Sequence, residues 1–272
     1  MEKTIGIIGF GNMGSAIANR IKSKYKVIIF DKDKSKTKCL ASIKVADTIF
    51  KLVKNTDVII LAVKPQDFNI ILAKIKNYAK DKLIISIAAG ITTDYIEKKL
   101  TKASVVRVMP NLPAQIGEGM ICLCKGKYAK KADLVFTQQL LKSLGTTLNI
   151  RKGLMNAVTA ISGSGPGYLY RLLQDKKKEE WEKFCSDDFF PKLSLAAQRI
   201  GFSIKEARVL AKTTINGSIS LLKTTGLTPE TLCLKVASKG GTTEAGLNVL
   251  NKDLNLEEAV KAALERAKKL ER

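Results

Sequence analysis

The 272-residue sequence contains no histidine. This absence excludes a histidine general base, a Ser-His-Asp triad and a zinc site of mixed cysteine and histidine ligands. Cysteine is also sparse, and its five positions are scattered without a C-x-x-C pair: Cys39, Cys122, Cys124, Cys185 and Cys233. We therefore expect no disulfide framework, no metal site and a reducing, cytoplasmic setting.

Long hydrophobic runs are missing as well. No stretch approaches the ~18 consecutive apolar residues of a membrane span. The first eight residues, MEKTIGII, have no apolar run of signal-peptide length. The sequence thus predicts neither a membrane association nor a targeting signal. Cys122 and Cys124 stand two apart in an apolar stretch, and we interpret them as packing residues on one side of a strand rather than a redox pair.

Acidic residues are few, 25 against 47 basic ones, which leaves a formal net charge of +22. Of the basic residues, 39 are Lys and 8 are Arg. Recognition of phosphates and bases favours the arginine fork, and these lysines are not clustered with aromatic residues. We therefore expect solvated lysines and no nucleic-acid partner, although a basic surface attracts anionic cofactors and carboxylate substrates.

The first half of the chain alternates between short apolar runs and helical patterns. Residues 4–8 predict a strand, 9–14 a glycine-rich turn, 15–21 a helix and 26–31 a second strand. Together they form a βαβ unit of about thirty residues. Further strands are expected at 57–63, 83–87, 104–109, 120–124 and 146–150, and further helices at 35–42, 68–78, 93–100 and 129–144. This pattern predicts a doubly wound α/β domain over residues 1–150.

Strand-like runs disappear after about Arg151, so residues 151–272 are expected to form an all-α domain. Helices are predicted at 156–161, 168–184, 193–200, 205–223, 229–236, 244–250 and 256–270. Residues 175–183, DKKKEEWEK, carry dense charge of both signs. This segment is expected to be an exposed helix face or a protruding insertion.

The glycine-rich turn has the spacing of a dinucleotide-binding loop. In such a loop Gly9 permits the tight turn, Gly11 lets the backbone approach a pyrophosphate, and Gly14 lets the helix pack against the strand. Asp31 follows Gly11 by 20 residues, where an acid accepts the ribose hydroxyls of NAD. Lys32, Lys34 and Ser35 come directly after it and suit a 2′-phosphate. NADH, NADPH and a merely solvated turn therefore all stay open.

Four further segments are candidate site loops. Residues 62–66, AVKPQ, and 86–90, SIAAG, each follow a predicted strand, where ligands bind in open α/β sheets. Residues 162–168, SGSGPGY, predict either a packed turn or a site. Residues 238–244, SKGGTTE, place hydroxyls and free N–H groups at a helix start, which suits a small carboxylate. The plain alternative for this last segment is a helix N-cap formed by Thr242 or Thr243.

These segments together resemble one family. GFGNMG, LAVKPQ, ISIAAGIT, VRVMPNLPAQIGEGM, AISGSGPGY and SKGGTTEAG occur in the order seen in pyrroline-5-carboxylate reductases, and the resemblance covers nearly the whole chain. It implies an N-terminal Rossmann domain and an all-α dimerisation and substrate-binding domain that interleaves its helices with a second copy. It further implies NADPH or NADH as cofactor, a cyclic imino acid as substrate, L-proline as product and a homodimer or higher homo-oligomer.

The resemblance also assigns roles to single residues. The pyrophosphate would contact the turn formed by Gly9, Phe10, Gly11, Asn12, Met13 and Gly14. The nicotinamide half would lie against Ala62, Val63, Lys64, Pro65, Ala88 and Ala89. The substrate carboxylate would lie on Ser238 and the backbone of Gly241, Thr242 and Thr243. The Thr243 hydroxyl would lie near the imine nitrogen as a hydrogen-bonding group. Asp31, Lys32 and Ser35 are further candidate cofactor contacts because of their position after the second strand, and not because of the resemblance.

Two other functions stay open. A related reductase would act on another cyclic imine or on a β-hydroxy acid, and the latter needs a catalytic lysine, for which Lys212 is a candidate by position only. A nucleotide-binding protein without turnover would use the charged segment as a partner surface. The stretch from Tyr168 to Gly201 is longer than in the family, which leaves the assembly open.

Overall fold

The computed structural model describes residues 3–38, 40 and 42–272. The chain forms two compact units. The first comprises residues 1–108, 123–152 and 272, and the second comprises residues 109–122 and 153–271. The predicted division of the chain between residues 150 and 151 stays a prediction.

The first unit is built on a sheet with the strand order β3-β2-β1-β4-β5-β6-β7-β8. The strands are β1 (Thr4–Ile8), β2 (Lys26–Phe30), β3 (Lys44–Val45), β4 (Val58–Leu61), β5 (Leu83–Ser86), β6 (Ser104–Met109), β7 (Gly119–Lys125) and β8 (Gly145–Asn149). The order reverses beside β1, which pairs in parallel with both β2 and β4. Such a reversal is the switch point at which open α/β sheets bind their ligands.

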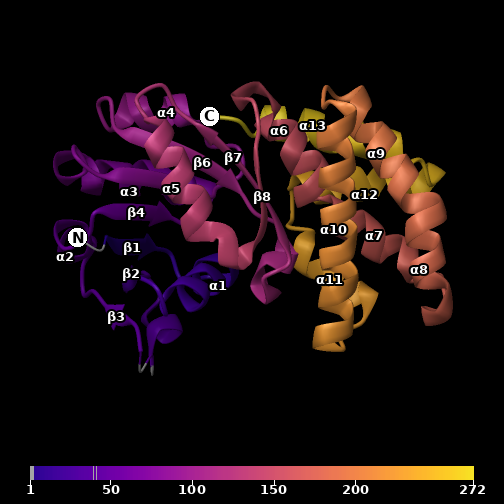
Figure 1. Ribbon diagram of the computed structural model, residues 1–272, viewed down its shortest axis with the longest axis horizontal. Helices are drawn as coiled ribbons and strands as arrows, with labels where there is room; N and C mark the ends of the chain where they lie inside the picture. Colours follow the sequence, from indigo (N-terminus) through magenta and orange to yellow (C-terminus); the bar gives the residue numbers. More distant parts are fainter. Residues whose placement is uncertain (1–2, 39, 41) are drawn as a thin grey trace. The chain divides into compact units, whose positions relative to one another are not determined.

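Helices cover both faces of this sheet (Figure 1). On one face α1 (Asn12–Ile21) contacts α5 (Lys131–Leu141). On the other, α3 (Phe68–Ile75) contacts both α2 (Ile49–Lys54) and α4 (Thr93–Lys99). The central strand β4 is apolar throughout and fully buried, as expected for a strand covered on both sides. The predicted doubly wound domain is confirmed.

The region between β2 and β4 differs from the prediction. The expected helix at 35–42 is wrong, because its described residues form a 3₁₀ turn, η1 (Lys34–Thr37), after which Lys38 is extended. Asp33 accepts the N–H and the hydroxyl of Ser35, and this local bonding competes with an α-helix. Residues 39 and 41, and with them Cys39, lie outside the described residues. β3 and α2 escaped prediction because they have only 2 and 6 residues.

The second unit is helical, with η4 (Leu112–Ile116) as its contribution from the middle of the chain. Its helices are α6 (Met155–Val158), α7 (Gly165–Leu173), α8 (Trp181–Phe184), α9 (Phe190–Arg199), α10 (Ile204–Thr225), α11 (Pro229–Val236), α12 (Thr242–Asp253) and α13 (Leu256–Lys269). Short π-helical stretches follow α6 and α8. Tyr168, Tyr170 and Phe189 are the largest buried side chains here.

α10 is the longest helix of this unit. Ser203 and Glu206 form a capping box at its start, and Gly226 ends it in the left-handed region. These are strong local signals, and they explain why its position was predictable.

The predicted continuous helix at 168–184 is wrong. α7 ends at Leu173, and a new start follows where the Lys177 N–H donates to the Glu180 carboxylate at 2.8 Å. Residues 175–180 offer no apolar stripe for packing, so the helix breaks there. Beyond the break, Glu182 pairs with Lys223 of α10 at 2.7 Å, and Cys185 and Phe189 are buried. Seven of the nine residues of the charged segment are exposed, as expected, and the Glu182–Lys223 ion pair connects this segment to α10.

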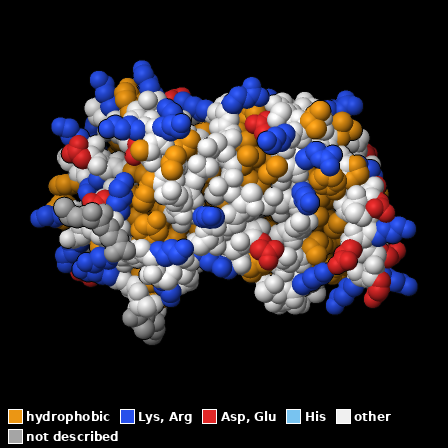
Figure 2. Space-filling model, in the orientation of Figure 1, with side chains coloured by type: hydrophobic (Ala, Val, Ile, Leu, Met, Phe, Trp, Pro, Cys, Tyr) orange, Lys and Arg blue, Asp and Glu red, His pale blue; other side chains and the backbone are white. Residues whose placement is uncertain are grey.

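The described residues include no helix long and apolar enough to cross a membrane and no metal-ligand cluster. Within the same residues Cys122, Cys124, Cys185 and Cys233 are free and buried, so Cys122 and Cys124 are packing residues as predicted. Lysine and arginine side chains are dispersed over the face seen in Figure 2.

Gly217 tests the packing of α10. A methyl group at this position would overlap the carbonyl oxygen of Glu118 and lie 2.8 Å from Pro113 Cβ. We expect Gly217→Ala to lower the free energy of unfolding by about 1–3 kcal/mol, measured by urea denaturation. The control Gly153→Ala meets nothing within 4 Å and should leave the midpoint unchanged. Equal midpoints for both variants would contradict this packing.

Candidate active site

The glycine-rich turn connects β1 to α1 in the first unit. Gly9 has a φ of +101°, in the region that favours glycine, and its N–H donates to the Phe30 carbonyl at 2.8 Å. A Cβ on Gly14 would overlap the Gly9 carbonyl oxygen, so α1 packs directly on the turn. A Cβ on Gly11 would meet nothing within 4 Å. Gly11 caps α1 without a side chain, which leaves the first N–H groups of the helix available to an anion.

A cavity of about 440 Å³ opens beside this turn. Its volume is in the range of small-molecule sites. Seven predicted cofactor residues line it: Gly9, Gly11, Asp31, Lys32, Ala62, Val63 and Lys64. Among the described residues, the lining does not include the other predicted contacts, Phe10, Asn12, Met13, Gly14, Ser35, Pro65, Ala88 and Ala89. The cofactor-binding roles of both groups of residues stay predictions.

Sequence reasoning missed part of this lining. Lys36, Asp67, Ile49, Ile70, Ile71 and Lys74 also line the cavity, with Ile8 and Phe30, whereas Gln66 belongs to the candidate loop 62–66. Ile49 belongs to α2, which was not predicted, and Ile70, Ile71 and Lys74 belong to α3. Ile70 is 59% exposed although it is a large apolar side chain. A single exposed apolar side chain is common on protein surfaces, so the sequence held no clear signal for this wall.

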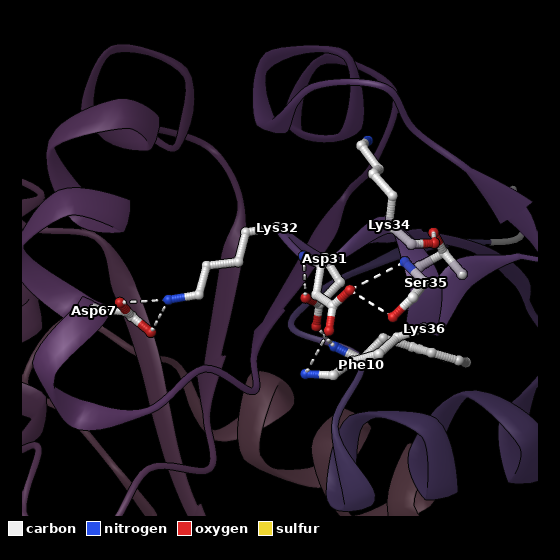
Figure 3. A network of polar contacts seen from close by, with 9 residues as sticks. Phe10, Asp31, Lys32, Lys34, Ser35, Lys36 and Asp67 are labelled. Carbon is white, nitrogen blue, oxygen red and sulfur yellow. Dashed lines mark hydrogen bonds and ion pairs between the residues drawn. The ribbon is translucent and has the colours of Figure 1, made fainter.

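The Asp31 side chain, which lines the cavity, accepts hydrogen bonds from two segments of the chain (Figure 3). One carboxylate oxygen accepts the Phe10 N–H at 2.6 Å, and the other accepts the Asp33 N–H at 2.8 Å. Asp31 is only 7% exposed. The acid at the end of β2 therefore binds the glycine-rich turn to the loop that follows β2.

The charged residues beside Asp31 are paired with one another. Lys32 Nζ lies 3.1 Å from both carboxylate oxygens of Asp67. Lys36 lies 3.8 Å from Asp33, whose carboxylate also accepts the Ser35 hydroxyl at 2.6 Å. Hydrogen bonds from the Ser35 side chain and backbone hold the pKa of Asp33 below its usual value. The Ser35 hydroxyl is thus engaged within its own loop.

A cluster of hydroxyl groups lies at the start of α12 in the second unit. The Thr243 hydroxyl donates to Ser164 Oγ at 3.0 Å, and Thr242 Oγ1 lies 3.2 Å from the same atom. Ser164 is fully buried, and Thr243 is 5% exposed. The N-cap residue is Gly241, without a side-chain bond, so the interpretation of Thr242 or Thr243 as an N-cap is wrong. Both hydroxyls are turned toward Ser164 instead.

Tyr168 borders this cluster. Burial raises the pKa of its phenol, whose oxygen has no hydrogen-bond partner among the described residues. A Cβ on Gly246 of α12 would lie 2.5 Å from the phenol oxygen, so glycine is needed for this contact. Tyr168 therefore stays protonated and neutral, and it cannot serve as a base. The sequence singled out the SGSGP loop but did not assign Ser164 a part in the cluster.

The loop before α12 is fixed from two sides. The Gly240 N–H donates to Glu244 at 2.7 Å, and Arg266 of α13 donates to the Gly240 carbonyl at 2.8 Å. The Gly241 N–H donates to the Ser238 carbonyl at 2.9 Å, so Ser238 lies against the N-terminus of α12. The structure thus brings the four predicted substrate residues together in one segment. Lys212 lies elsewhere, in a cavity of about 640 Å³ with Glu118, Cys185 and Arg208.

A nucleotide-type turn at the switch point of a parallel sheet, followed by a helical unit, defines the class of nicotinamide-nucleotide-dependent oxidoreductases. Residues 4–90 match the family described as NADP oxidoreductase coenzyme F420-dependent, and residues 188–271 match pyrroline-5-carboxylate reductase dimerisation. The chain is 35% identical over 253 residues to pyrroline-5-carboxylate reductase of Aquifex aeolicus, covering 90% of this chain and 88% of that protein. It is 32% identical over 280 residues to pyrroline-5-carboxylate reductase 2 of Bacillus subtilis, covering 98% and 93%.

Solved structures agree. The Plasmodium falciparum pyrroline carboxylate reductase with NADP bound matches with a TM-score of 0.66 at 28% identity, covering 99% of this chain and 98% of that one. The Coxiella burnetii pyrroline-5-carboxylate reductase matches with a TM-score of 0.68 at 26% identity and covers both chains fully. This chain belongs to the pyrroline-5-carboxylate reductase family.

Gly11 tests the glycine-rich turn. We expect Gly11→Ala to weaken binding of NADPH and NADH roughly tenfold or more, because the methyl group would stand between the backbone and the pyrophosphate. Stability should not change, since the methyl group meets no protein atom within 4 Å. Titration calorimetry and urea denaturation measure the two effects. The matched variant Gly14→Ala should instead lower stability, and an unchanged cofactor affinity in Gly11→Ala would contradict the assignment.

Proposed function

We propose that this chain reduces 1-pyrroline-5-carboxylate to L-proline with NADPH or NADH. The observation that carries the proposal is the buried hydroxyl pair of Thr243 and Ser164 at the start of α12, in a chain of this reductase family. The relatives named above carry the same activity in their names. An enzyme without histidine can perform this reaction, because a protonated imine is already a good electrophile and mainly needs positioning.

The first unit fits a nicotinamide dinucleotide. Gly11 leaves open space where its side chain would stand, and the uncapped start of α1 presents N–H groups to the pyrophosphate. Gly9 and Gly11 would hold the pyrophosphate, and Ala62, Val63 and Lys64 would contact the nicotinamide half. When bound, the cofactor supplies the hydride. The chain's own residues fix the orientation of that cofactor at the carboxyl ends of the strands.

The second unit fits a small carboxylate. The first N–H groups of α12 have no partner within the helix, and the helix dipole favours an anion at this end. Ser238 and Gly241 lie at the same point, held by Glu244 and Arg266 through Gly240. We infer that the substrate carboxylate binds to the Ser238 hydroxyl and the N–H groups at this helix start.

Thr243 then serves the imine nitrogen. Its hydroxyl hydrogen is donated to Ser164, so its oxygen is left to accept the N–H of the protonated imine. Hydride addition to the imine carbon makes a C–H bond, and the C=N electron pair becomes the lone pair of the product amine. The nitrogen keeps the proton it already carried. Thr243 is therefore a hydrogen-bond acceptor here and need not act as an acid.

Assembly and location complete the proposal. Residues 188–271 match a dimerisation family, and we infer a homodimer or a higher homo-oligomer. A cytoplasmic location stays a prediction from the sequence. The alternative of a hydroxy-acid reductase would require Lys212 at the reacting carbon, and Lys212 is not among the described contacts of the Thr243 cluster.

Turnover tests the role of Thr243. Purified protein should oxidise NADPH or NADH when pyrroline-5-carboxylate is added. We expect Thr243→Ala to lower kcat/KM about 10- to 100-fold, the worth of one hydrogen bond to a charged group. Thr243→Ser keeps the hydroxyl and should retain most activity. Unchanged kcat/KM in Thr243→Ala would refute this role.

The wild-type protein tests the reaction itself. Folded protein that binds NADPH without oxidising it in the presence of pyrroline-5-carboxylate would contradict the proposed reaction. That result would favour the nucleotide-binding alternative instead.

A further inference from the structure

Two lining residues of the cavity in the first unit, Lys32 and Asp67, form an ion pair. Lys32 follows β2, and Asp67 lies in η2 (Pro65–Asp67), directly after β4, 35 residues further along the chain. Lys32 Nζ lies 3.1 Å from each carboxylate oxygen, and both residues line the cavity (Figure 3). The pair therefore links two loops that both follow the carboxyl ends of parallel strands.

The Lys32–Asp67 ion pair is more exposed to solvent than the neighbouring carboxylate of Asp31. The Lys32 side chain is 77% exposed and that of Asp67 is 24% exposed. Ion pairs with such exposure contribute little to stability, because water competes for both charges. Asp31, in contrast, is buried and uses both carboxylate oxygens for backbone N–H groups. Lys32 can exchange its partner, whereas Asp31 is fixed by the fold.

The cavity also has an excess of positive charge. Its charged lining consists of Lys32, Lys36, Lys64 and Lys74 against Asp31 and Asp67. A phosphate monoester carries about −1.5 to −2 charges at pH 7 and three strong acceptor oxygens. It is therefore a better partner for Lys32 than a single carboxylate, and a ribose hydroxyl is a poorer one.

We propose that Asp67 determines cofactor specificity by competing with the 2′-phosphate of NADPH for Lys32. With NADH the Lys32–Asp67 pair stays closed, and with NADPH Lys32 turns to the phosphate. The cavity then accepts both cofactors and binds the phosphorylated one more tightly, while Asp67 limits the difference. This inference rests on the proposed function only for the identity of the cofactor.

Two nucleotide fragments test the proposal without any reaction. Adenosine 2′,5′-bisphosphate and 5′-AMP differ only in the 2′-phosphate, and neither carries a nicotinamide. By titration calorimetry we expect the wild-type protein to bind the bisphosphate more tightly. Asp67→Asn should tighten bisphosphate binding about two- to fivefold, the worth of an exposed ion pair. Binding of 5′-AMP should stay unchanged.

Lys32 provides the second arm. Lys32→Gln should weaken binding of the bisphosphate about tenfold, since it removes a charge-assisted bond. It should weaken binding of 5′-AMP much less, because 5′-AMP has no 2′-phosphate to lose that bond. In the double variant Lys32→Gln with Asp67→Asn, the gain in bisphosphate affinity should vanish, because the lysine for which Asp67 competes is gone. Persistence of that gain in the double variant would overturn the proposal.

A matched control separates competition from general charge. Asp47→Asn removes one negative charge from another exposed pair, in which Lys51 Nζ lies 2.7 Å from the Asp47 carboxylate. It should change neither affinity. An equal gain in Asp47→Asn, an equal gain for 5′-AMP in Asp67→Asn, or no gain at all would overturn the role of Asp67.

Failure of the proposed reaction gives a different result. If folded protein shows the Asp67→Asn gain but does not reduce pyrroline-5-carboxylate, the ion-pair competition stands and the reaction is wrong. If it reduces pyrroline-5-carboxylate and Asp67→Asn binds the bisphosphate like the wild type, the reaction stands and the competition is wrong.

Discussion

The buried carboxylate of Asp31 is the constraint on which the first unit's site depends. It accepts N–H groups from the glycine-rich turn and from the loop after β2, two segments that are far apart in the sequence. Loss of such an acceptor would leave the buried Phe10 N–H without a partner, which costs about 1–3 kcal/mol. The Asp31 carboxylate thus connects the glycine-rich turn with the loop after β2.

In the second unit, neutral hydroxyl groups hold one another in place at the start of α12. Ser164, Thr242 and Thr243 satisfy one another's hydroxyls, and Tyr168 packs beside them as a neutral phenol. Buried polar groups must be paired, so each hydroxyl in this cluster has a restricted orientation. Pairing of this kind fixes the direction of each hydroxyl oxygen in a unit that contains no histidine. The fixed orientation of these hydroxyls is therefore the feature of this unit that bears on its chemistry.

Much of the fold was predictable because its signals are local. The strands at 4–8, 58–61 and 83–86 are apolar runs between turns, and α10 carries a capping box and a terminal glycine. The failures have equally local causes. β3 is too short to show a period, and hydrogen bonds from Ser35 to Asp33 replaced the helix expected at 35–42. The helix expected at 168–184 is interrupted because residues 175–180 are all charged and offer no apolar face for packing.

By itself the sequence determined the doubly wound domain, the helical second half, the glycine-rich turn and the family, because each rests on periodicity or on short contiguous motifs. Only the tertiary structure decided which partner each polar group of the candidate sites has. The Asp31 carboxylate accepts backbone N–H groups, and Lys32 forms an ion pair with Asp67. Thr243 is hydrogen-bonded to Ser164, from which it is separated by 79 positions in the sequence. Such partners meet only after folding, since their separation along the chain leaves no local pattern by which either residue can be matched to the other.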